Sequence, residues 1–522
     1  MAQTYDVIVV GSGHNGLVAA GYLAKAGKSV LVLERNAFFG GGVVTREVAA
    51  PGFRHDTHSM GHAVIQANPL IRNDELGLKS KFGLEYIYQP AQFSTTFPDG
   101  RSLVTHIDLD KSCESIAQFS ERDAEAYRVL AKASSQMAPM MAQSMFSPPP
   151  PMGAFMAMLD QSPQGRGMMR TMQRSILSVL NDHFVSDELK VHYLRLAGES
   201  FVAPDAGGYG ILLGALTGMM HSHPPGVPKG GSGSLVDSLV RCLESYGAEL
   251  RANTTVDKFV IENGKTVGVR LQDGTEIRAR TCVIGQIHPK VLPSMVEGLD
   301  PQVAVECKEV ELAKFVCVAS HYALNTPPDL GSELLHGCPL NSFAPASVQE
   351  YLQAMDTIVR DGDMSSTKML AVHTISNFDA TRAPVGKASM TVWRFAPKTL
   401  SGGRTWDDYK AQADEETHNM VTSLIPNIEG NVVGRHFETP LDMERYNPTF
   451  QQGDVNGVAK VFYQTQGHRP SPSLAQYAVP GANGLYLAGC FMHPAGGVTG
   501  GGRATAIKIF TDLGLDFDKV TV

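Results

Sequence analysis

The chain has 522 residues, of which 43% are hydrophobic and 18% are charged, and its formal net charge is −8. This length predicts two domains, and the composition is that of a folded protein rather than a disordered one. The chain contains no long basic run, which argues against nucleic acid as a partner.

Seven scattered cysteines form no C-x-x-C pair. A disulfide framework and a structural zinc site are therefore both disfavoured. No apolar run reaches the roughly 18 to 20 residues that a membrane-spanning helix needs. The apolar stretch near the N-terminus also lacks the pattern of a secretory signal. We therefore expect a cytoplasmic, soluble protein that is at most peripheral to a membrane.

The first residues predict a βαβ unit. Residues 7–10 (VIVV) and 29–34 (SVLVLE) are apolar runs typical of strands buried in a parallel sheet. Between them, residues 17–27 are rich in Ala and Leu and end at a glycine, as a helix does. A glycine motif, GSGHNG, joins the first strand to this helix. In this context the motif is a specific sign of dinucleotide binding.

Each position of the unit has an expected role. Gly11 permits a tight turn, Gly13 lets the backbone approach a pyrophosphate, and Gly16 lets the helix pack close to the sheet. The helix N-terminus offers free N–H groups to the phosphates. Glu34 follows the second strand and is expected to accept both hydroxyls of an unphosphorylated ribose. The predicted cofactor contacts here are Gly11, Ser12, Gly13, His14, Asn15, Gly16, Glu34 and Arg35.

A second glycine cluster, Gly40 to Gly42, follows the acid closely. It suits the long dinucleotide FAD better than a nicotinamide cofactor. We expect Gly41, Gly42 and Val43 to contact FAD.

Three stretches carry a resemblance to a known family: GSGHNGLVAAGYLAKAG, the glycine cluster, and PGFRHDTHS. They resemble the phytoene-desaturase-like branch of the FAD-dependent amine-oxidase superfamily. The HNG of the first turn is most similar to the pyridine-nucleotide-disulfide-oxidoreductase-domain-2 subgroup. The resemblance implies an FAD-dependent oxidoreductase that binds its flavin noncovalently.

Residues 228–285 carry the resemblance further. The pattern predicts a helix, a hairpin with turns at NG and DG, and a buried strand at TCVIG. In the family this segment belongs to the FAD domain. The position of Val256 there contacts the adenine end through its backbone.

Residues 483–510 contain a strand (LYLAG), the glycine-rich loop HPAGGVTGGG and the start of a helix. The resemblance implies that this loop passes beneath the flavin, because close backbone N–H donors suit flat polar cofactor atoms. The implied contacts are Gly489, Cys490, Gly497, Val498 and Thr499. Ala495 stands where carotenoid desaturases usually carry glycine, which weakens a carotenoid assignment.

The predicted fold is therefore α/β, with a discontinuous Rossmann-type FAD-binding domain (residues 1–85, 226–295 and 470–522) and an α+β substrate domain (residues 86–225 and 296–469). The stretch GGYGILLGALTG at 207–218 lacks a preceding strand, so we do not interpret it as a second dinucleotide motif. Without a nicotinamide domain, electrons are expected to pass from the flavin to dioxygen, a quinone or another carrier.

Ten methionines lie between Met137 and Met172, and Pro148 to Pro151 must interrupt any helix there. This segment fits a tunnel mouth, a lid, or a patch that meets a membrane or a partner. It fits a helical core or a contact between protomers equally well. Homo-oligomerisation stays open.

The sequence leaves the catalytic residue unassigned. His62, His223 and His493 are weak candidates, and the histidine spacing does not predict a metal site. The leading hypothesis is dehydrogenation of an apolar or ring-containing small molecule by hydride transfer to FAD. A carotenoid or isoprenoid desaturase, saturase or isomerase is the alternative within enzymes. A non-catalytic FAD-bound assembly factor or electron-transfer partner is the alternative of another class.

Overall fold

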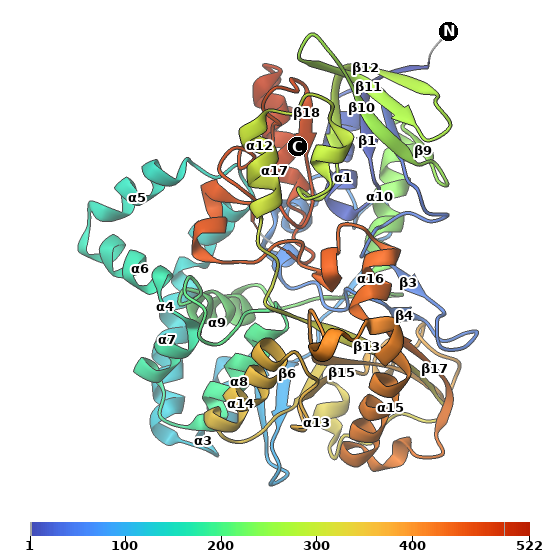
Figure 1. Cartoon of the computed structure of the whole chain (residues 1–522). Coiled ribbons are helices and arrows are strands. Elements are labelled where there is room, and N and C mark those ends of the chain that lie inside the picture. The colour runs from blue at the N-terminus through green and yellow to red at the C-terminus, as the bar shows by residue number, and fades with distance from the viewer. Residues whose placement is uncertain (1–2, 495, 522) are drawn as a thin grey trace.

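Two seven-stranded sheets organise the chain in the computed structural model, which describes residues 3–494 and 496–521 (Figure 1). The first sheet has the order β10-β11-β12-β1-β2-β9, and β18 also pairs with β12. Its strands are β1 (Thr4–Val10), β2 (Val30–Leu33), β9 (Glu249–Arg251), β10 (Val256–Glu262), β11 (Lys265–Leu271), β12 (Glu276–Gly285) and β18 (Leu485–Leu487). It therefore joins three stretches that are far apart in the sequence.

Pairing within the first sheet follows the local sequence pattern. The apolar strands β1, β2, β12 and β18 pair in parallel, whereas β10, β11 and β12 form an antiparallel meander. Three helices pack on this sheet: α1 (His14–Lys25), α10 (Gly233–Ser245) and α17 (Gly502–Asp512). Both α10 and α17 also pack on α1. A Cβ atom on Gly502 would lie 1.8 Å from the carbonyl oxygen of Asn15, so only glycine lets α17 lie this close to α1.

The second sheet has the order β17-β13-β16-β15-β14-β6-β7 and is antiparallel except for the pair β14–β6. Its strands are β6 (Ala91–Thr96), β7 (Ser102–His106), β13 (Phe315–Leu324), β14 (Leu340–Phe343), β15 (Leu370–His373), β16 (Ala388–Pro397) and β17 (Val432–Glu438). Every residue of β13 and β16 is buried. Both faces of the sheet centre are therefore covered, even though the two strands carry polar side chains such as His321 and Arg394.

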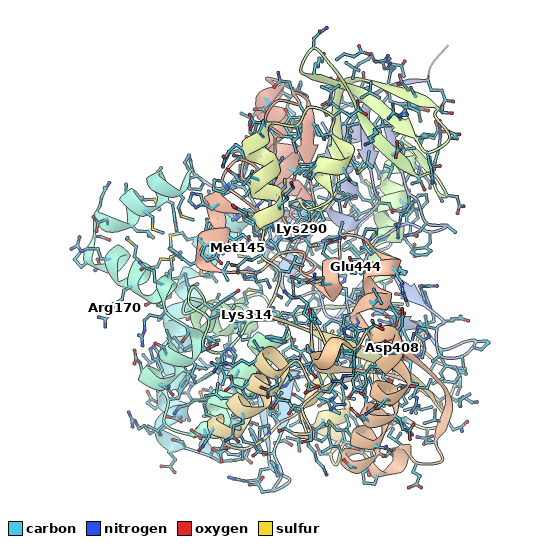
Figure 2. All side chains as sticks on the ribbon, viewed as in Figure 1. Met145, Arg170, Lys290, Lys314, Asp408 and Glu444 are labelled. Atoms are coloured by element: carbon cyan, nitrogen blue, oxygen red, sulfur yellow. The ribbon has the colours of Figure 1, made fainter. Side chains whose placement is uncertain are left out.

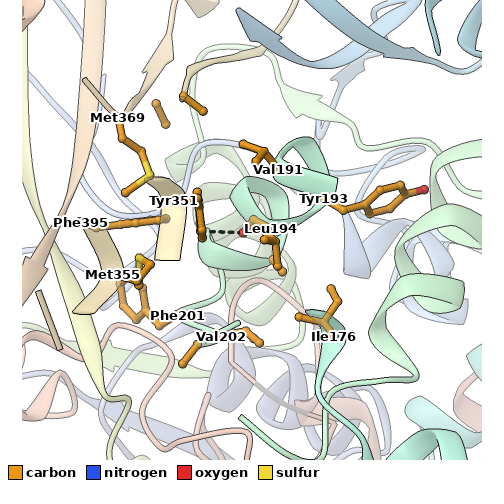
Figure 3. Close-up of a cluster of buried hydrophobic side chains, with 14 of the residues drawn as sticks. Ile176, Val191, Tyr193, Leu194, Phe201, Val202, Tyr351, Met355, Met369 and Phe395 are labelled. Carbon is orange, nitrogen blue, oxygen red and sulfur yellow. Dashed lines mark hydrogen bonds between the residues drawn. The ribbon is translucent and has the colours of Figure 1, made fainter. Parts of the chain in front are cut away.

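A helical layer packs beside the second sheet. It contains α3 (Leu109–Ala117), α4 (Glu121–Met145), α7 (Ile176–His183), α8 (Asp187–Gly198), α9 (Leu212–Ser222) and α14 (Val348–Asp356). Figure 3 shows the core that holds α8, where Val191 and Leu194 lie among Tyr351, Phe395 and their apolar neighbours. The hydroxyl of Tyr351 donates a hydrogen bond of 3.0 Å to the carbonyl of Leu194. Because one face of α8 packs into this core, the orientation of the opposite face is fixed as well.

The methionine-rich segment forms the end of α4 and a pair of short helices, α5 (Met152–Asp160) and α6 (Pro163–Gln173), which project from the body (Figure 1). The run of prolines separates α4 from α5, as expected. Leu159 is the one buried residue of α5, and Arg170 on α6 points away from the body (Figure 2). No helix in the described part of the chain is long and apolar enough to cross a membrane.

The remaining elements connect or edge these layers. They are β3 (Thr45–Arg46), β4 (His55–Asp56), β5 (Tyr86–Ile87), β8 (Val227–Pro228), α2 (Pro69–Arg72), α11 (Leu292–Met295), α12 (Pro301–Glu309), α13 (Glu333–His336), α15 (Trp406–Leu424) and α16 (Pro440–Tyr446).

Candidate functional site

A cavity of about 680 Å³ begins at the carboxyl ends of β1 and β2 and extends to the second sheet and to α8 and α9. The carboxyl edge of a parallel sheet is where α/β folds place their ligands. The predicted cofactor residues line this cavity, with Gly16 as the exception: Gly11, Ser12, Gly13, His14, Asn15, Glu34, Arg35, Gly41, Gly42, Val43, Val256, Gly489, Cys490, Gly497, Val498 and Thr499.

The N-terminus of α1 opens onto the cavity with unused backbone donors. Gly13 is the N-cap and supplies no side-chain cap, and the first N–H bonded within the helix is that of Leu17, which donates to the carbonyl of Gly13 at 3.1 Å. Among the described residues, the N–H groups of Asn15 and Gly16 have no hydrogen-bond acceptor, which leaves them available to an anion. A Cβ atom on Gly13 would lie 2.7 Å from Oε1 of Gln286. This bare turn fits the diphosphate of FAD.

Glu34 is 5% exposed and is held in place at the end of β2. Its Oε2 accepts hydrogen bonds from the Ser12 backbone N–H (3.0 Å) and the Ser12 hydroxyl (2.6 Å), and its Oε1 accepts from the N–H of Asn36 (2.8 Å). An ionised carboxylate can accept further bonds on each oxygen. Glu34 can therefore still accept hydrogen bonds from ribose hydroxyls, although Ser12 and Asn36 already donate to its two oxygens.

Arg35 has a different role in the structure from its neighbour. Its Nη2 donates to the carbonyls of Arg445 (2.9 Å) and Tyr446 (3.1 Å) at the end of α16. The side chain therefore connects the end of β2 to the end of α16. The residue also lines the cavity.

Gly16 lies behind the cavity wall. A Cβ atom there would lie 2.1 Å from Nε2 of Gln286, whose amide donates to the carbonyl of Gly11 at 2.6 Å. The absence of a side chain at Gly16 thus makes room for Gln286, the residue directly after β12. The sequence pattern pointed to close helix packing at Gly16 but gave no reason to select Gln286.

The C-terminal loop closes the cofactor end of the cavity. A Cβ atom on Gly496 would lie 2.5 Å from the Cα of Asn456, so this loop sits directly on the chain of the second half. Burial raises the pKa of the Cys490 thiol to about 12, which keeps it protonated and unreactive at neutral pH. Ala495 lies outside the described residues.

The three histidines suggested as catalytic candidates are not among the residues that line the cavity. His62 is buried between the Tyr86 hydroxyl (3.0 Å) and the Ser232 hydroxyl (3.1 Å), and burial lowers its pKa to about 3. His223 follows the last turn of α9. His493 bonds the carbonyl of Ser144 through Nε2 at 3.2 Å, and burial lowers its pKa to about 4. His62 and His493 connect segments of the fold.

Other histidines take their place in the wall: His58, His288 and His373, beside the predicted His14. Burial lowers the pKa of His14, His58 and His288 to about 4 and that of His373 to about 3. The imidazoles of the cavity are therefore uncharged at neutral pH. Nothing in the local sequence around these residues marks them as a group.

Behind His58, a buried carboxylate is surrounded by imidazoles. Oε2 of Glu438 lies 3.7 Å from Nε2 of both His58 and His321, and its Oε1 lies 3.4 Å from Nε2 of His436. Burial alone would raise the pKa of Glu438, but the contacts with His321 and His436 lower it overall. No group of three or more His, Cys, Asp or Glu residues in the described part of the chain has the geometry of a metal site.

The far wall consists of two helical stripes. The cavity is lined by Leu196 on the last turn of α8 and by Glu199 and Ser200 directly after it. Five residues of α9 line it as well: Leu212, Ala215, Leu216, Met219 and Met220. Both sets follow the i, i+3, i+4 spacing of one helix face. This spacing was readable in GGYGILLGALTGMM, but the pattern does not say what the stripe faces. Lys460 also lines the cavity, and burial lowers its pKa to about 8.

Comparison with known proteins finds that the chain is similar to oxidoreductases over nearly its full length. Residues 9–71 match the NAD(P)-binding Rossmann-like domain. The chain is 28% identical over 561 residues to the rat pyridine nucleotide-disulfide oxidoreductase domain-containing protein 2, covering 98% of this chain and 94% of the relative. It is 24% identical over 540 residues to one of the limonene dehydrogenase subunits of Castellaniella defragrans (98% and 95% covered). It is 23% identical over 531 residues to the lycopene-forming phytoene desaturase of Pseudescherichia vulneris (97% and 99% covered).

Solved structures share the fold at lower identity. An oxidoreductase from Methanosarcina mazei superposes with a TM-score of 0.63 at 15% identity, covering 97% of this chain and 99% of that one. Cyclohexylamine oxidase from Brevibacterium oxydans superposes with a TM-score of 0.60 at 15% identity, covering 98% and 99%. In sequence the chain is similar to phytoene-desaturase-like, FAD-dependent oxidoreductases, and it shares its fold with cyclohexylamine oxidase.

Proposed function

We propose that this protein dehydrogenates an apolar or ring-containing small molecule by hydride transfer to noncovalently bound FAD. One observation carries the proposal: a single cavity is bounded at one end by the bare glycine turn and Glu34, and at the other by the apolar stripes of α8 and α9. A pocket lined mainly by apolar side chains with a few polar groups is typical of a small-molecule site.

Each part of the wall has a task in this reaction. The α1 N-terminus would hold the diphosphate, Glu34 the ribose, and the loops at 489–490 and 497–499 the flavin end. The bound FAD supplies the hydride acceptor. The aliphatic stripes exclude water and orient the substrate. Lys460, with a pKa of about 8, is positioned in the wall to take up a proton when it is uncharged.

The choice of electron acceptor depends on whether the chain has a second dinucleotide-binding motif. No second glycine motif follows a strand elsewhere in the sequence, so a nicotinamide partner bound on the same chain is not expected. We propose dioxygen, a quinone or another carrier as the acceptor. The protected thiol of Cys490 agrees with noncovalent flavin.

An isoprenoid desaturase, saturase or isomerase is the second candidate function. The names of two relatives support it, because limonene and phytoene are both isoprenoid hydrocarbons. The solved cyclohexylamine oxidase has the same fold and is named for an amine, so fold alone does not separate the candidates.

Anaerobic mixing of the purified yellow protein with candidate substrates tests the proposal, with loss of the oxidised flavin absorbance as the measurement. We expect bleaching by small ring-containing molecules. Bleaching by long polyenes alone would favour the desaturase. A flavin that no metabolite reduces, together with stable recovery of a partner protein, would favour the non-catalytic alternative.

A further inference from the structure

The apolar end of the cavity contains one carboxylate that the proposed hydride transfer does not explain. Glu199 lines the cavity directly after α8, in a wall that also contains the apolar side chains of Leu196, Leu212, Leu216 and Met219. Its side chain is 14% exposed. A buried charge of this kind is costly unless it is paired and hydrogen-bonded.

Arg195 supplies the charge partner from behind the wall. Its Nη2 donates to Oε1 of Glu199 at 2.7 Å. The guanidinium is fixed by its own contacts, since Nε donates to the Ser342 hydroxyl at 2.8 Å and the group lies 4.2 Å from the centre of the Phe395 ring. Arg195 is 1% exposed and does not itself border the cavity. The pair therefore has no net charge.

The second oxygen of Glu199 has no hydrogen-bond partner within the described residues. This oxygen can still accept a hydrogen bond, and it belongs to a residue that lines the cavity. The neighbouring Ser200 lines the cavity too, and the C-terminus of α8 adds a partial negative charge at the same place. The other charged residues that line the cavity are Glu34, Arg35 and Lys460. The open carboxylate oxygen and the helix end therefore both favour a hydrogen-bond donor.

We propose that Glu199 accepts a hydrogen bond from an N–H or O–H group of the substrate. The preferred substrate is then a largely apolar ring or chain molecule with one such donor, and a pure hydrocarbon is disfavoured. A hydrocarbon would cover the open carboxylate oxygen without satisfying it, which costs far more than a missing methylene contact. This inference rests on the proposed function and narrows its substrate class.

Binding of simple probes to the FAD-loaded protein tests the inference. Cyclohexylamine, cyclohexanol and methylcyclohexane are similar in size and differ in the donor, and perturbation of the flavin absorbance spectrum reports their binding. We expect the two donor-bearing probes to bind about tenfold or more tightly than methylcyclohexane. Whichever of cyclohexylamine and cyclohexanol binds more tightly identifies N–H or O–H as the recognised group.

Glu199→Gln keeps the side-chain shape and removes the charged acceptor. We expect its affinity for cyclohexylamine and cyclohexanol to fall about tenfold or more, with the affinity for methylcyclohexane changed less than about twofold. Glu188→Gln, on the first turn of α8 and outside the cavity lining, is the matched control and should change none of the three. FAD content and thermal unfolding verify the fold of each variant. If Glu199→Gln does not fold, Arg195→Met combined with Glu199→Leu removes both charges and should show the same loss of selectivity.

Three results would overturn the inference: equal wild-type affinity for methylcyclohexane, equal weakening of all three probes in Glu199→Gln, or no spectral response to either donor-bearing probe. None of these three results contradicts the proposed function, which is tested separately. A protein that binds FAD and is bleached by hydrocarbons alone remains a dehydrogenase but does not recognise a donor. A protein that binds no FAD fails the proposed function itself.

Discussion

The two ends of the cavity are built from different materials. Around the first sheet, the wall is largely main chain: the turn at Gly11–Asn15, the loop at Gly41–Gly42 and the loop at Gly497–Thr499. Around α8 and α9, the wall is made of side chains on regular helices. A backbone wall tolerates no added atoms, whereas a side-chain wall can be altered one residue at a time. The cofactor end should therefore respond to substitution in an all-or-none way and the substrate end in a graded way.

Gly13→Val should give the largest effect. The φ of Gly13 is −59°, which valine can adopt, and the nearest obstacle is the flexible end of Gln286, so the chain should still fold. The branched side chain would stand over the free N–H groups of α1 and block the diphosphate. We expect a colourless protein, measured by absorbance at the flavin band and by the lower Tm that loss of a bound ligand produces.

The matched control is Gly167→Val on α6, where an added Cβ meets no atom within 4 Å. It should retain its yellow colour. Full flavin content in Gly13→Val would show that this turn does not hold the diphosphate.

Acid should destabilise the fold around the cavity. The pKa of His14, His58 and His288 is about 4 in the folded protein, below the ordinary value of about 6.5. As the pH falls from about 6.5 to 4, these residues bind protons in the unfolded chain but not in the folded one, so stability is lost over that window. We expect Tm to fall steadily across it, measured by differential scanning calorimetry at constant ionic strength. A flat Tm between about pH 6.5 and 4.5 would contradict the burial of these imidazoles.

Glu34→Gln should weaken FAD binding without abolishing it. The amide keeps one acceptor oxygen but loses the charge and cannot accept on both sides from Ser12, Asn36 and a ribose. We expect the Kd for FAD to rise about tenfold, measured by fluorescence titration of the deflavinated protein. Glu47→Gln, which changes an exposed carboxylate of the neighbouring segment, should leave the Kd unaltered.

Leu216→Ala should produce the most local change. Removing part of the α9 stripe takes away apolar contact with the substrate, which we expect to weaken an apolar probe about tenfold while FAD content stays the same. Val129→Ala, on the exposed side of α4, provides the comparison. Loss of flavin in Leu216→Ala would mean that the two ends of the cavity are not independent.

Most of the cofactor end could be predicted because its determinants are consecutive in the chain. Gly11, Gly13 and Glu34 lie within one βαβ unit, whose strands, helix and turn are each set by local residue patterns. The exceptions are informative. Gln286 completes the Gly16 contact from a distant part of the chain, and the histidines chosen by their position next to motifs, His62 and His493, instead connect segments of the fold.

By itself, the sequence determined the dinucleotide turn, the strands of the first sheet and the family resemblance, because these depend on neighbours in the chain and on periodicities of about two or 3.6 residues. Tertiary structure alone decided what the α8 and α9 stripes face and that Arg195 balances Glu199 from behind the wall. It also brought His58 together with Glu438. A periodic pattern specifies a face of an element, but the partner of that face depends on how distant elements pack. Charge balance and burial, and with them the chemistry of the substrate end, exist only after that packing.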